Sequence, residues 1–174
     1  MTAPRLRVRD ETAADHAAVR SVLAQAFPSD AEARLVDVLR GRTQPQVSLV
    51  AVDPSDRVVG HILFTPVEIH ASSGSSRAMG LGPMAVSPGE QRRGAGSALV
   101  EAGLAACVAI GERVVVVLGH PDYYPRFGFQ RAWDFGLYYA APGANPAFMV
   151  RELERGALRG LDGEVVYHAA FGSL

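Results

Sequence analysis

A strand that leads into a glycine-rich loop and then a helix is the feature that most constrains the fold of this chain. From Leu81 the sequence reads LGPMAVSPGEQRRGAG, and a helix is expected over Gly94–Ile110. A helix N-terminus offers N–H groups without intrahelical partners and the positive end of a helix dipole. Gly94 and Gly96 permit close approach to the backbone, where a Cβ would collide with a ligand. The segment therefore predicts a phosphate or pyrophosphate site, with an ordinary turn that opens a helix as the alternative.

The residues of this loop and of the helix after it exclude two common phosphate-binding motifs. A P-loop needs a lysine after its second glycine, and all 17 basic side chains of the chain are arginines. A dinucleotide-binding fingerprint needs a third glycine three residues after Gly96, where the chain has Leu99. The pattern that remains is Gln91-x-x-Gly94-x-Gly96.

Length and composition predict one globular domain over residues 1–174, located in the cytoplasm. A formal net charge of −1 argues against a nucleic-acid partner. We expect no membrane span and no export, because Met1–Asp10 lacks an apolar signal region and Ala102–Val117 is interrupted by charges and glycines. A single cysteine, Cys107, excludes an intrachain disulfide and is predicted to be a core thiol. The histidines share no metal-ligand spacing, so no metal is expected.

The order of strands and helices predicts an α+β layered domain with a largely antiparallel sheet and one β-α-β crossover. Glycines and a proline within one predicted strand, at Gly80, Gly82 and Pro83, predict a bulge or bend there. Helices are expected over 12–27, 29–41 and 94–110, and strands over 6–9, 47–52, 58–69, 77–86, 113–118, 148–153 and 165–169.

A second motif follows the buried strand Val114–Leu118: the chain continues His-Pro-Asp-Tyr-Tyr-Pro-Arg-Phe-Gly-Phe from His120 to Phe129. Tyr124 stands four residues before the pair Gly128-Phe129. Together the two motifs resemble the GNAT superfamily of N-acyltransferases and, with Val59-Gly60-His61, its YhbS-like bacterial subgroup, over residues 27–171. The resemblance implies a three-layer α/β/α GNAT-type acyl-CoA N-acyltransferase fold, with a mixed, mostly antiparallel sheet, splayed central strands and flanking helices.

The resemblance also implies acetyl-CoA as cosubstrate and a role for each motif. Tyr124 would be the catalytic acid toward the departing thiolate, and a packed aromatic is its alternative reading. Gln91 would shape the loop. Backbone N–H groups would bind pantetheine at Met84, Ala85 and Val86, and pyrophosphate at Arg92, Arg93, Gly94, Ala95, Gly96 and Ser97.

The implied reaction is acetyl transfer to a primary amine by direct attack in a ternary complex, and a non-catalytic acyl-CoA-binding or regulatory module is the alternative. The acceptor is an amine-bearing small molecule or a peptide, and a homodimer is compatible with the family. An amine that is protonated at neutral pH needs a proton acceptor. His120 and Glu68 are candidates for contact with the acceptor by residue type and placement, although Glu68 is as well suited to a solvent face, and the general base stays unassigned. His61 is expected to be a satisfied strand histidine.

Overall fold

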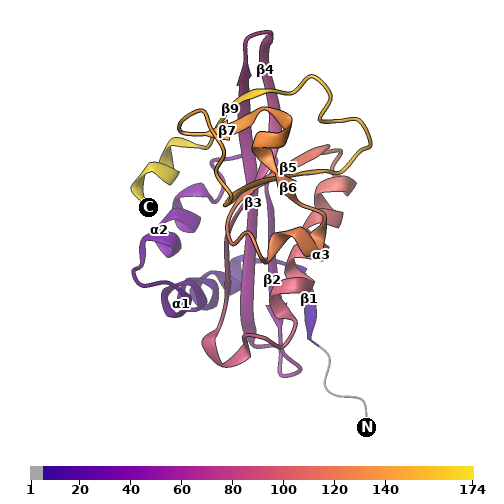
Figure 1. The fold of residues 1–174 in the computed structure, drawn as a ribbon. Helices are drawn as coiled ribbons and strands as arrows, with labels where there is room; N and C mark the ends of the chain where they lie inside the picture. The colour runs from indigo at the N-terminus through magenta and orange to yellow at the C-terminus, as the bar shows by residue number, and fades with distance from the viewer. Residues whose placement is uncertain (1–5) are drawn as a thin grey trace. The chain divides into compact units, whose positions relative to one another are not determined.

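The computed structural model describes residues 6–174, so part of Met1–Asp10 lies outside the described residues. The chain divides into two compact units. Figure 1 labels strands β3 (Val58–Ala71) and β4 (Gly74–Val86) and helix α3 (Ala95–Ala109). Each of these three elements contributes residues to both units. Unit 1 comprises the chain up to Phe64, Pro83–Gly103 and Ala170–Leu174, and unit 2 comprises Thr65–Gly82 and Leu104–Ala169.

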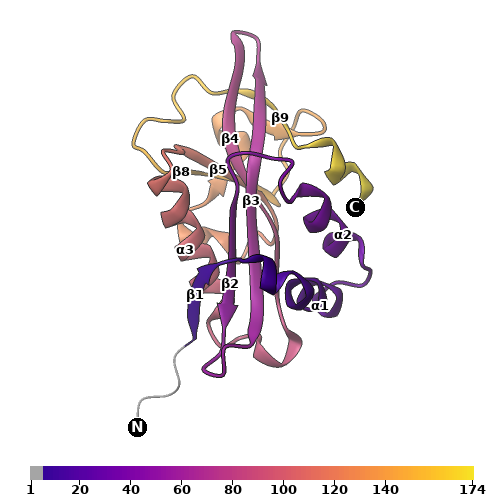
Figure 2. The same ribbon diagram turned by 180° about the vertical axis from the view of Figure 1, so that it is seen from behind.

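Unit 1 combines an antiparallel set of strands with the first two helices. Strand β1 (Arg7–Asp10) pairs with β2 (Val47–Val52), which in turn pairs with the first half of β3 up to Phe64. Helices α1 (His16–Ala26) and α2 (Ala31–Leu39) follow one another beside these strands (Figure 2). The strand and helices predicted for this part of the chain are confirmed, with ends that differ by one to a few residues.

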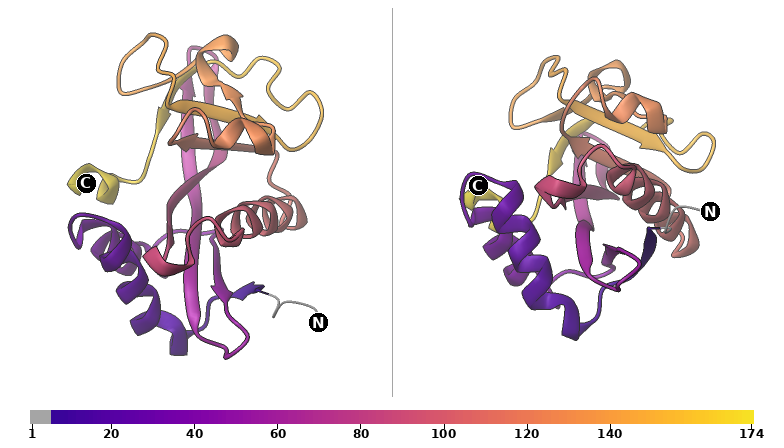
Figure 3. Two further views of the ribbon diagram at one scale, coloured as in Figure 1. Left: turned by 60° about the horizontal axis from the view of Figure 1, so that its bottom comes forward. Right: turned by 90° about the horizontal axis from the view of Figure 1, so that it is seen from below.

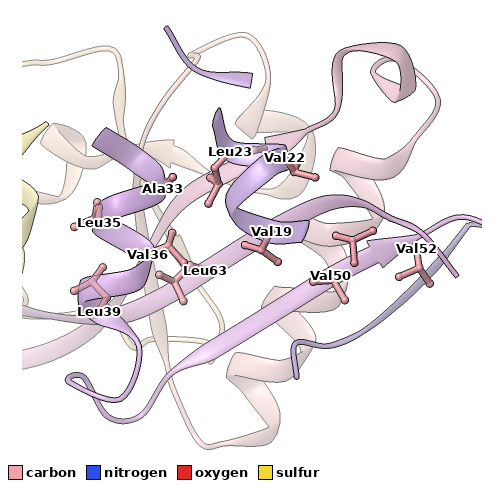
Figure 4. Close-up of a cluster of buried hydrophobic side chains, with 12 residues drawn as sticks. Val19, Val22, Leu23, Ala33, Leu35, Val36, Leu39, Val50, Val52 and Leu63 are labelled. Atoms are coloured by element: carbon pink, nitrogen blue, oxygen red, sulfur yellow. The ribbon is translucent and has the colours of Figure 1, made fainter. Parts of the chain in front are cut away.

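The core of unit 1 lies between these helices and the sheet. Apolar residues recur on one side of each helix, and Figure 4 shows them turned toward side chains of β2 and β3. The C-terminal end of the chain lies beside α2 (Figure 3), and Phe171 packs against the same cluster. The buried members are Val19, Val22, Leu23, Ala33, Leu35, Val36, Leu39, Val50, Val52, Val58, Leu63 and Ala85.

Unit 2 contains the second half of β3, the first part of β4 and five further strands. Helix α3 connects β4 to β5 (Val114–Leu118), and the two strands pair in parallel, as the predicted β-α-β crossover requires. The remaining strands are β6 (Gln130–Arg131), β7 (Leu137–Tyr139), β8 (Phe148–Glu152) and β9 (Gly163–Val166). Antiparallel pairing joins β5 to β8, β8 to β6 and β3 to β9, whereas β7 and β9 are parallel.

The hydrogen-bonded order of the strands is β1-β2-β3-β4-β5-β8-β6, with β9 bonded to β3 and β7. The sheet is thus mixed and mostly antiparallel, as predicted. A separate core fills unit 2, made of Val67, Ile69, Ala78, Val114, Val116, Ala132, Leu137, Phe148, Val150, Ala157, Leu158 and Val165. Short 3-10 helices cover Ala13–Asp15, Pro88–Glu90, Tyr124–Phe127, Ala132–Phe135 and Ala169–Ser173.

The parallel pairing of β4 with β5 is short. It covers Met79↔Val115 to Leu81↔Val117, although β4 continues to Val86. Gly82 follows at once and has φ +141°, a conformation that only glycine adopts readily. The irregularity predicted around Gly82 therefore coincides with the end of the β4–β5 ladder.

None of the helices among residues 6–174 combines the length and the apolar character needed to cross a membrane.

Candidate functional site

The glycine-rich loop of unit 1 is anchored at both ends by hydrogen bonds. The Ser87 N–H donates to the Val59 carbonyl at 2.8 Å, which ties the start of the loop to β3. The Gln91 side-chain amide donates to the Val86 carbonyl at 3.2 Å and bridges the loop back to the end of β4. The Gln91 side chain therefore ties the loop to the end of β4.

Two residues of the loop have a left-handed backbone conformation. Arg92 has φ +63° and Gly94 has φ +90°. A left-handed arginine is unfavourable by about 1 kcal/mol or more, and such strain concentrates at ligand sites. A Cβ at Gly94 would meet no atom of the described residues within 4 Å, so packing does not require glycine at this position. Alternating backbone conformations of this kind form a concave group of N–H donors that suits an anion.

Helix α3 adds its own free donors directly after this turn. The Ala98 N–H donates to the Gly94 carbonyl at 3.0 Å. The N–H groups of Ala95, Gly96 and Ser97 therefore precede the first intrahelical hydrogen bond and lie at the positive end of the helix dipole. Ala95 is buried, whereas Gly96 and Ser97 are half-buried.

Both arginines of the loop are exposed, and Arg93 is paired. Its guanidinium donates to the Glu90 carboxylate at 3.2 Å, and Arg57 reaches the same carboxylate at 3.3 Å. An exposed pair of this kind contributes little to stability, about 0–1 kcal/mol. Arg92 is exposed as well, so both arginines can add positive charge around the loop. The donors with a fixed position in the loop are its backbone N–H groups.

Met84, Ala85 and Val86 form the end of β4, beyond the last residue of the strand that pairs with β5. Ala85 is buried, and Met84 and Val86 are half-buried. The Ala85 carbonyl lies only 3.2 Å from the position that a Cβ at Gly60 would occupy, so glycine on β3 allows the two backbones to approach closely. This placement leaves the backbone of β4 without a β5 partner along the three residues predicted to bind pantetheine.

In unit 2, Tyr124 opens a 3-10 turn and is only 6% exposed. Its ring contacts Tyr123 (5.1 Å between centroids) and Phe129 (5.6 Å), both in edge-on geometry. The turn ends at Gly128, whose φ of +83° explains the glycine of the Gly-Phe pair. Burial, with a smaller contribution from Tyr123, raises the pKa of the Tyr124 phenol above its ordinary value of 10. Tyr124 is therefore a neutral hydrogen-bond donor at physiological pH.

The two candidates for acceptor contact are exposed to solvent. The Glu68 side chain, 68% exposed, forms a 2.7 Å contact with the His70 imidazole on the same face of β3. His120 is also exposed, and its carbonyl accepts hydrogen bonds from the N–H groups of Tyr123 and Tyr124. His120 is thus tied to Tyr124 through its backbone, while Glu68 contacts a surface histidine.

A buried charged cluster in unit 1 is absent from the sequence-based expectations. Glu11 accepts hydrogen bonds from Arg40 and Ser48, each at 2.6 Å, and Ser48 also bonds His61 Nε2 at 2.8 Å. His61 is fully buried, and its Nδ1 has no hydrogen-bond partner among the described residues. The prediction of a satisfied strand histidine therefore holds for Nε2 alone. Burial by itself raises the pKa of Glu11, but His61, Arg40 and Ser48 outweigh it and lower the pKa to about 2.

No metal centre or reactive thiol accompanies these groups. Within residues 6–174, no three histidine, cysteine or acidic side chains are grouped as a metal ion would require. Cys107 is fully buried in α3, and burial raises the pKa of its thiol to about 12. A thiol with so high a pKa is a poor nucleophile, which agrees with the predicted core role.

Comparison with known proteins places this geometry in a family. Residues 7–132 match the model of the acetyltransferase (GNAT) domain. The chain is 36% identical over 164 residues to the N-acetyltransferase YhbS of Escherichia coli K12, covering 94% of this chain and 97% of the relative. It is 38% identical over 131 residues to the E. coli K12 N-acetyltransferase YjhQ, covering 74% of this chain and 71% of the relative.

Two solved structures have a similar fold. The crystal structure of E. coli YhbS in complex with CoA matches with a TM-score of 0.90 at 35% identity, covering 99% of this chain and 94% of that one. A GNAT acetyltransferase from Brucella melitensis in complex with acetyl-CoA matches with a TM-score of 0.77 at 32% identity, covering 96% and 98%. The predicted GNAT fold is confirmed, and the chain belongs to the GNAT family of acetyltransferases.

Proposed function

We propose that this acetyltransferase moves the acetyl group of acetyl-CoA to a primary amine by direct attack within a ternary complex, and that residues 1–174 act as one N-acetyltransferase domain. The observation that carries the proposal is the loop of unit 1, in which left-handed Arg92 and Gly94 lead into the free N–H groups of α3. The chemistry of this donor set fits a pyrophosphate, because it combines several N–H groups with a helix dipole and needs no lysine. Complexes of the relatives with CoA and acetyl-CoA support the same cosubstrate.

The proposed coenzyme contacts are made mainly by the backbone. The N–H groups of Arg92, Arg93, Gly94, Ala95, Gly96 and Ser97 hold the pyrophosphate, and Gln91 keeps the loop in shape through its bond to Val86. Backbone N–H groups of the segment Met84, Ala85 and Val86 pair with the pantetheine amides. One of them donates to the thioester carbonyl, where a donor aimed at the developing oxyanion lowers the barrier by about 3–4 kcal/mol.

Acetyl-CoA supplies an acetyl group that is activated as a thioester. Tyr124 donates a hydrogen bond to the sulfur, and this bond strengthens as negative charge develops on the departing thiolate. Full proton transfer is not required of it. A thiol with a pKa near 8.5 is a stronger acid than a phenol with a pKa near 10, and the difference corresponds to about 2 kcal/mol. The raised pKa of Tyr124 widens this difference.

The acceptor is proposed to be an amine-bearing small molecule or a peptide, and it reacts as the neutral amine. Glu68 and His120 are exposed, which favours transfer of the proton from the amine through water. Either side chain could accept the proton from that water. The base itself is not assigned to one residue.

The test is thiol release from acetyl-CoA across a panel of primary amines, measured together with coenzyme binding. We expect amine-dependent release by the wild-type protein and a matching acetylated product. A non-catalytic acyl-CoA-binding module would instead bind the coenzyme tightly and release no thiol with any amine. That outcome would contradict the proposed transfer while leaving the coenzyme site intact.

A further inference from the structure

Two tyrosine rings of unit 2 pack against glycines on, or directly after, the parallel strands β4 and β5. A Cβ at Gly80 on β4 would come within 2.8 Å of Tyr167 Cε1. A Cβ at Gly119, directly after β5, would come within 2.4 Å of Tyr124 Cε2. Gly80 is in register with Val116 of β5, so both rings rest on the same pair of strands. Each glycine is needed because a phenol ring fills the space of its side chain.

Tyr167 lies among apolar and aromatic side chains of unit 2. Tyr167 follows the end of β9, and its ring packs against the apolar core of unit 2. It meets the Tyr139 ring edge-on at 5.5 Å between centroids. Burial raises the pKa of Tyr167, and the phenols of Tyr139 and Tyr124 add to the effect, as close neighbours do.

A third hydroxyl lies on the neighbouring strand. Thr65 on β3 is fully buried, and its Oγ1 has no hydrogen-bond partner among the described residues. Side chains two residues apart on a strand share a face, so Thr65 lies on the same face as Val67. Val67 Cγ1 is 2.8 Å from the Cβ position of Gly80, as is Tyr167 Cε1. A buried hydroxyl without a partner is costly unless a ligand or water supplies one.

We propose that Tyr167 and Thr65 hold the amine acceptor, with the Tyr167 hydroxyl hydrogen-bonded to its nitrogen. This inference rests on the proposed acetyl transfer. Hydroxyl oxygens accept N–H hydrogen bonds from an amine without requiring it to stay charged. Tyr139 meets the Tyr167 ring edge-on, and Val67 lies beside the same Gly80 position as that ring, so the neighbourhood of Tyr167 is aromatic and aliphatic. The acceptor class is therefore a primary amine carried on an aromatic or aliphatic group, rather than a polyamine with several charges.

The test uses Tyr167→Phe and Thr65→Val in the full-length protein, with Tyr138→Phe as the control. Tyr138 contacts the exposed Trp133 ring and lies outside this group of hydroxyls. Binding of 2-phenylethylamine and of spermidine to CoA-saturated protein is measured by calorimetry, and KM and kcat are measured by thiol release. Tyr167→Phe and Thr65→Val are each expected to weaken 2-phenylethylamine binding about fivefold and to raise its KM about as much, as loss of one neutral hydrogen bond implies. The affinity for CoA and the melting temperature are expected to stay near the wild-type values.

Each outcome decides between the alternatives. Amine affinity within twofold of wild type in both variants overturns the inference, even where acetyl transfer occurs. Failure of 2-phenylethylamine to bind the wild type, or tighter binding of spermidine, also overturns it. Weakened amine binding in Tyr167→Phe and Thr65→Val, together with no thiol release by the wild type, supports the acceptor site and contradicts the proposed transfer instead.

Discussion

The ring of Tyr124 lies against the backbone of Gly119, where an added Cβ would stand 2.4 Å from Tyr124 Cε2. The ring has little freedom to move, because Tyr123 and Phe129 contact it edge-on. Gly119→Ala is therefore expected to displace the Tyr124 hydroxyl. Small displacements of a catalytic group are costly, so we expect kcat to fall about 10- to 100-fold with an unchanged Kd for acetyl-CoA. Steady-state kinetics and calorimetry measure the two quantities.

A matched control for this change is Gly172→Ala, because a Cβ at Gly172 would meet nothing within 4 Å. It is expected to leave kcat unaltered. A Gly119→Ala protein with full activity would show that the ring position is unimportant for turnover.

Removal of the Tyr124 hydroxyl alone tests its proposed role as donor. Tyr124→Phe keeps the ring contacts and is expected to lower kcat about 10- to 100-fold, as loss of a hydrogen bond to a charged group implies. Because burial raises the pKa of Tyr124 above 10, the phenol stays protonated as the pH rises from 7 to 10. The wild-type kcat is thus expected to show no decline from Tyr124 in that range. Full activity in Tyr124→Phe would contradict the assignment of Tyr124 as the hydrogen-bond donor to the sulfur.

The coenzyme loop can be tested with two glycines that share a backbone conformation. Gly94 and Gly111 have φ of +90° and +86°, and neither would place a Cβ within 4 Å of the described residues. Valine at either position is strained in the same way, so both variants should lose some stability. Only Gly94→Val is expected to lose acetyl-CoA affinity, by at least tenfold, because its side chain enters the proposed pyrophosphate site. Equal affinities in the two variants would place the pyrophosphate elsewhere.

The buried carboxylate of Glu11 predicts a dependence of stability on pH. Its pKa is lowered from 4.5 to about 2, so the folded state binds this proton more weakly than the unfolded state. The contribution, about 3 kcal/mol, is fully present above pH 5 and is lost as the pH falls toward 2. Glu11→Gln is therefore expected to lower the free energy of unfolding at pH 7, with a difference from wild type that narrows below pH 5. Urea unfolding at several pH values measures it.

Glu154→Gln serves as the control for this prediction. Glu154 pairs with Arg113 on the surface, where both side chains are more than half exposed. Its loss is expected to change the free energy of unfolding by less than about 1 kcal/mol at every pH. A pH-independent deficit in Glu11→Gln would show that the carboxylate acts through packing and not through its charge.

Direct transfer to the acceptor predicts that the protein itself stays unacetylated. The chain has no lysine, and burial raises the pKa of Cys107 to about 12. Incubation with acetyl-CoA alone should therefore give no acetyl adduct on Cys107 by peptide mass spectrometry. An acetylated Cys107 that transfers its acetyl group to an amine would contradict a ternary-complex reaction.

The parts of the molecule that could be predicted from the sequence are those set by local patterns. The loop from Ser87 to Gly94 and the helix after it have strong local signals in glycine spacing and apolar periodicity. Tyr124 was identified because the short motif around it resembles the GNAT family, and the left-handed Gly128 of that motif is part of the same turn. These features depend on neighbouring residues, so one sequence is enough to find them.

The parts that escaped prediction depend on contacts between distant residues. The closing strand was expected at 165–169 and lies at Gly163–Val166. Gly163, with φ +123°, lets β9 approach the His70 carbonyl of β3, where a Cβ would come within 2.2 Å. Tyr167 then leaves the strand and reaches Gly80. The cluster around Glu11 was missed for the same reason, because Arg40, Ser48 and His61 come from three separate elements.

The division of the core has a consequence for synthesis of the chain. Phe171 packs against the cluster formed by α1, α2 and the first strands, more than sixty residues after Gly103, the last preceding residue of that unit. A ribosome adds residues at roughly 5–20 per second. Phe171 is therefore synthesised on the order of 3–13 s after Gly103. During that interval the apolar faces of α1 and α2 are incompletely covered. The last residues of the chain therefore act late in folding, and their loss is expected to lengthen the exposure of a surface that chaperones recognise.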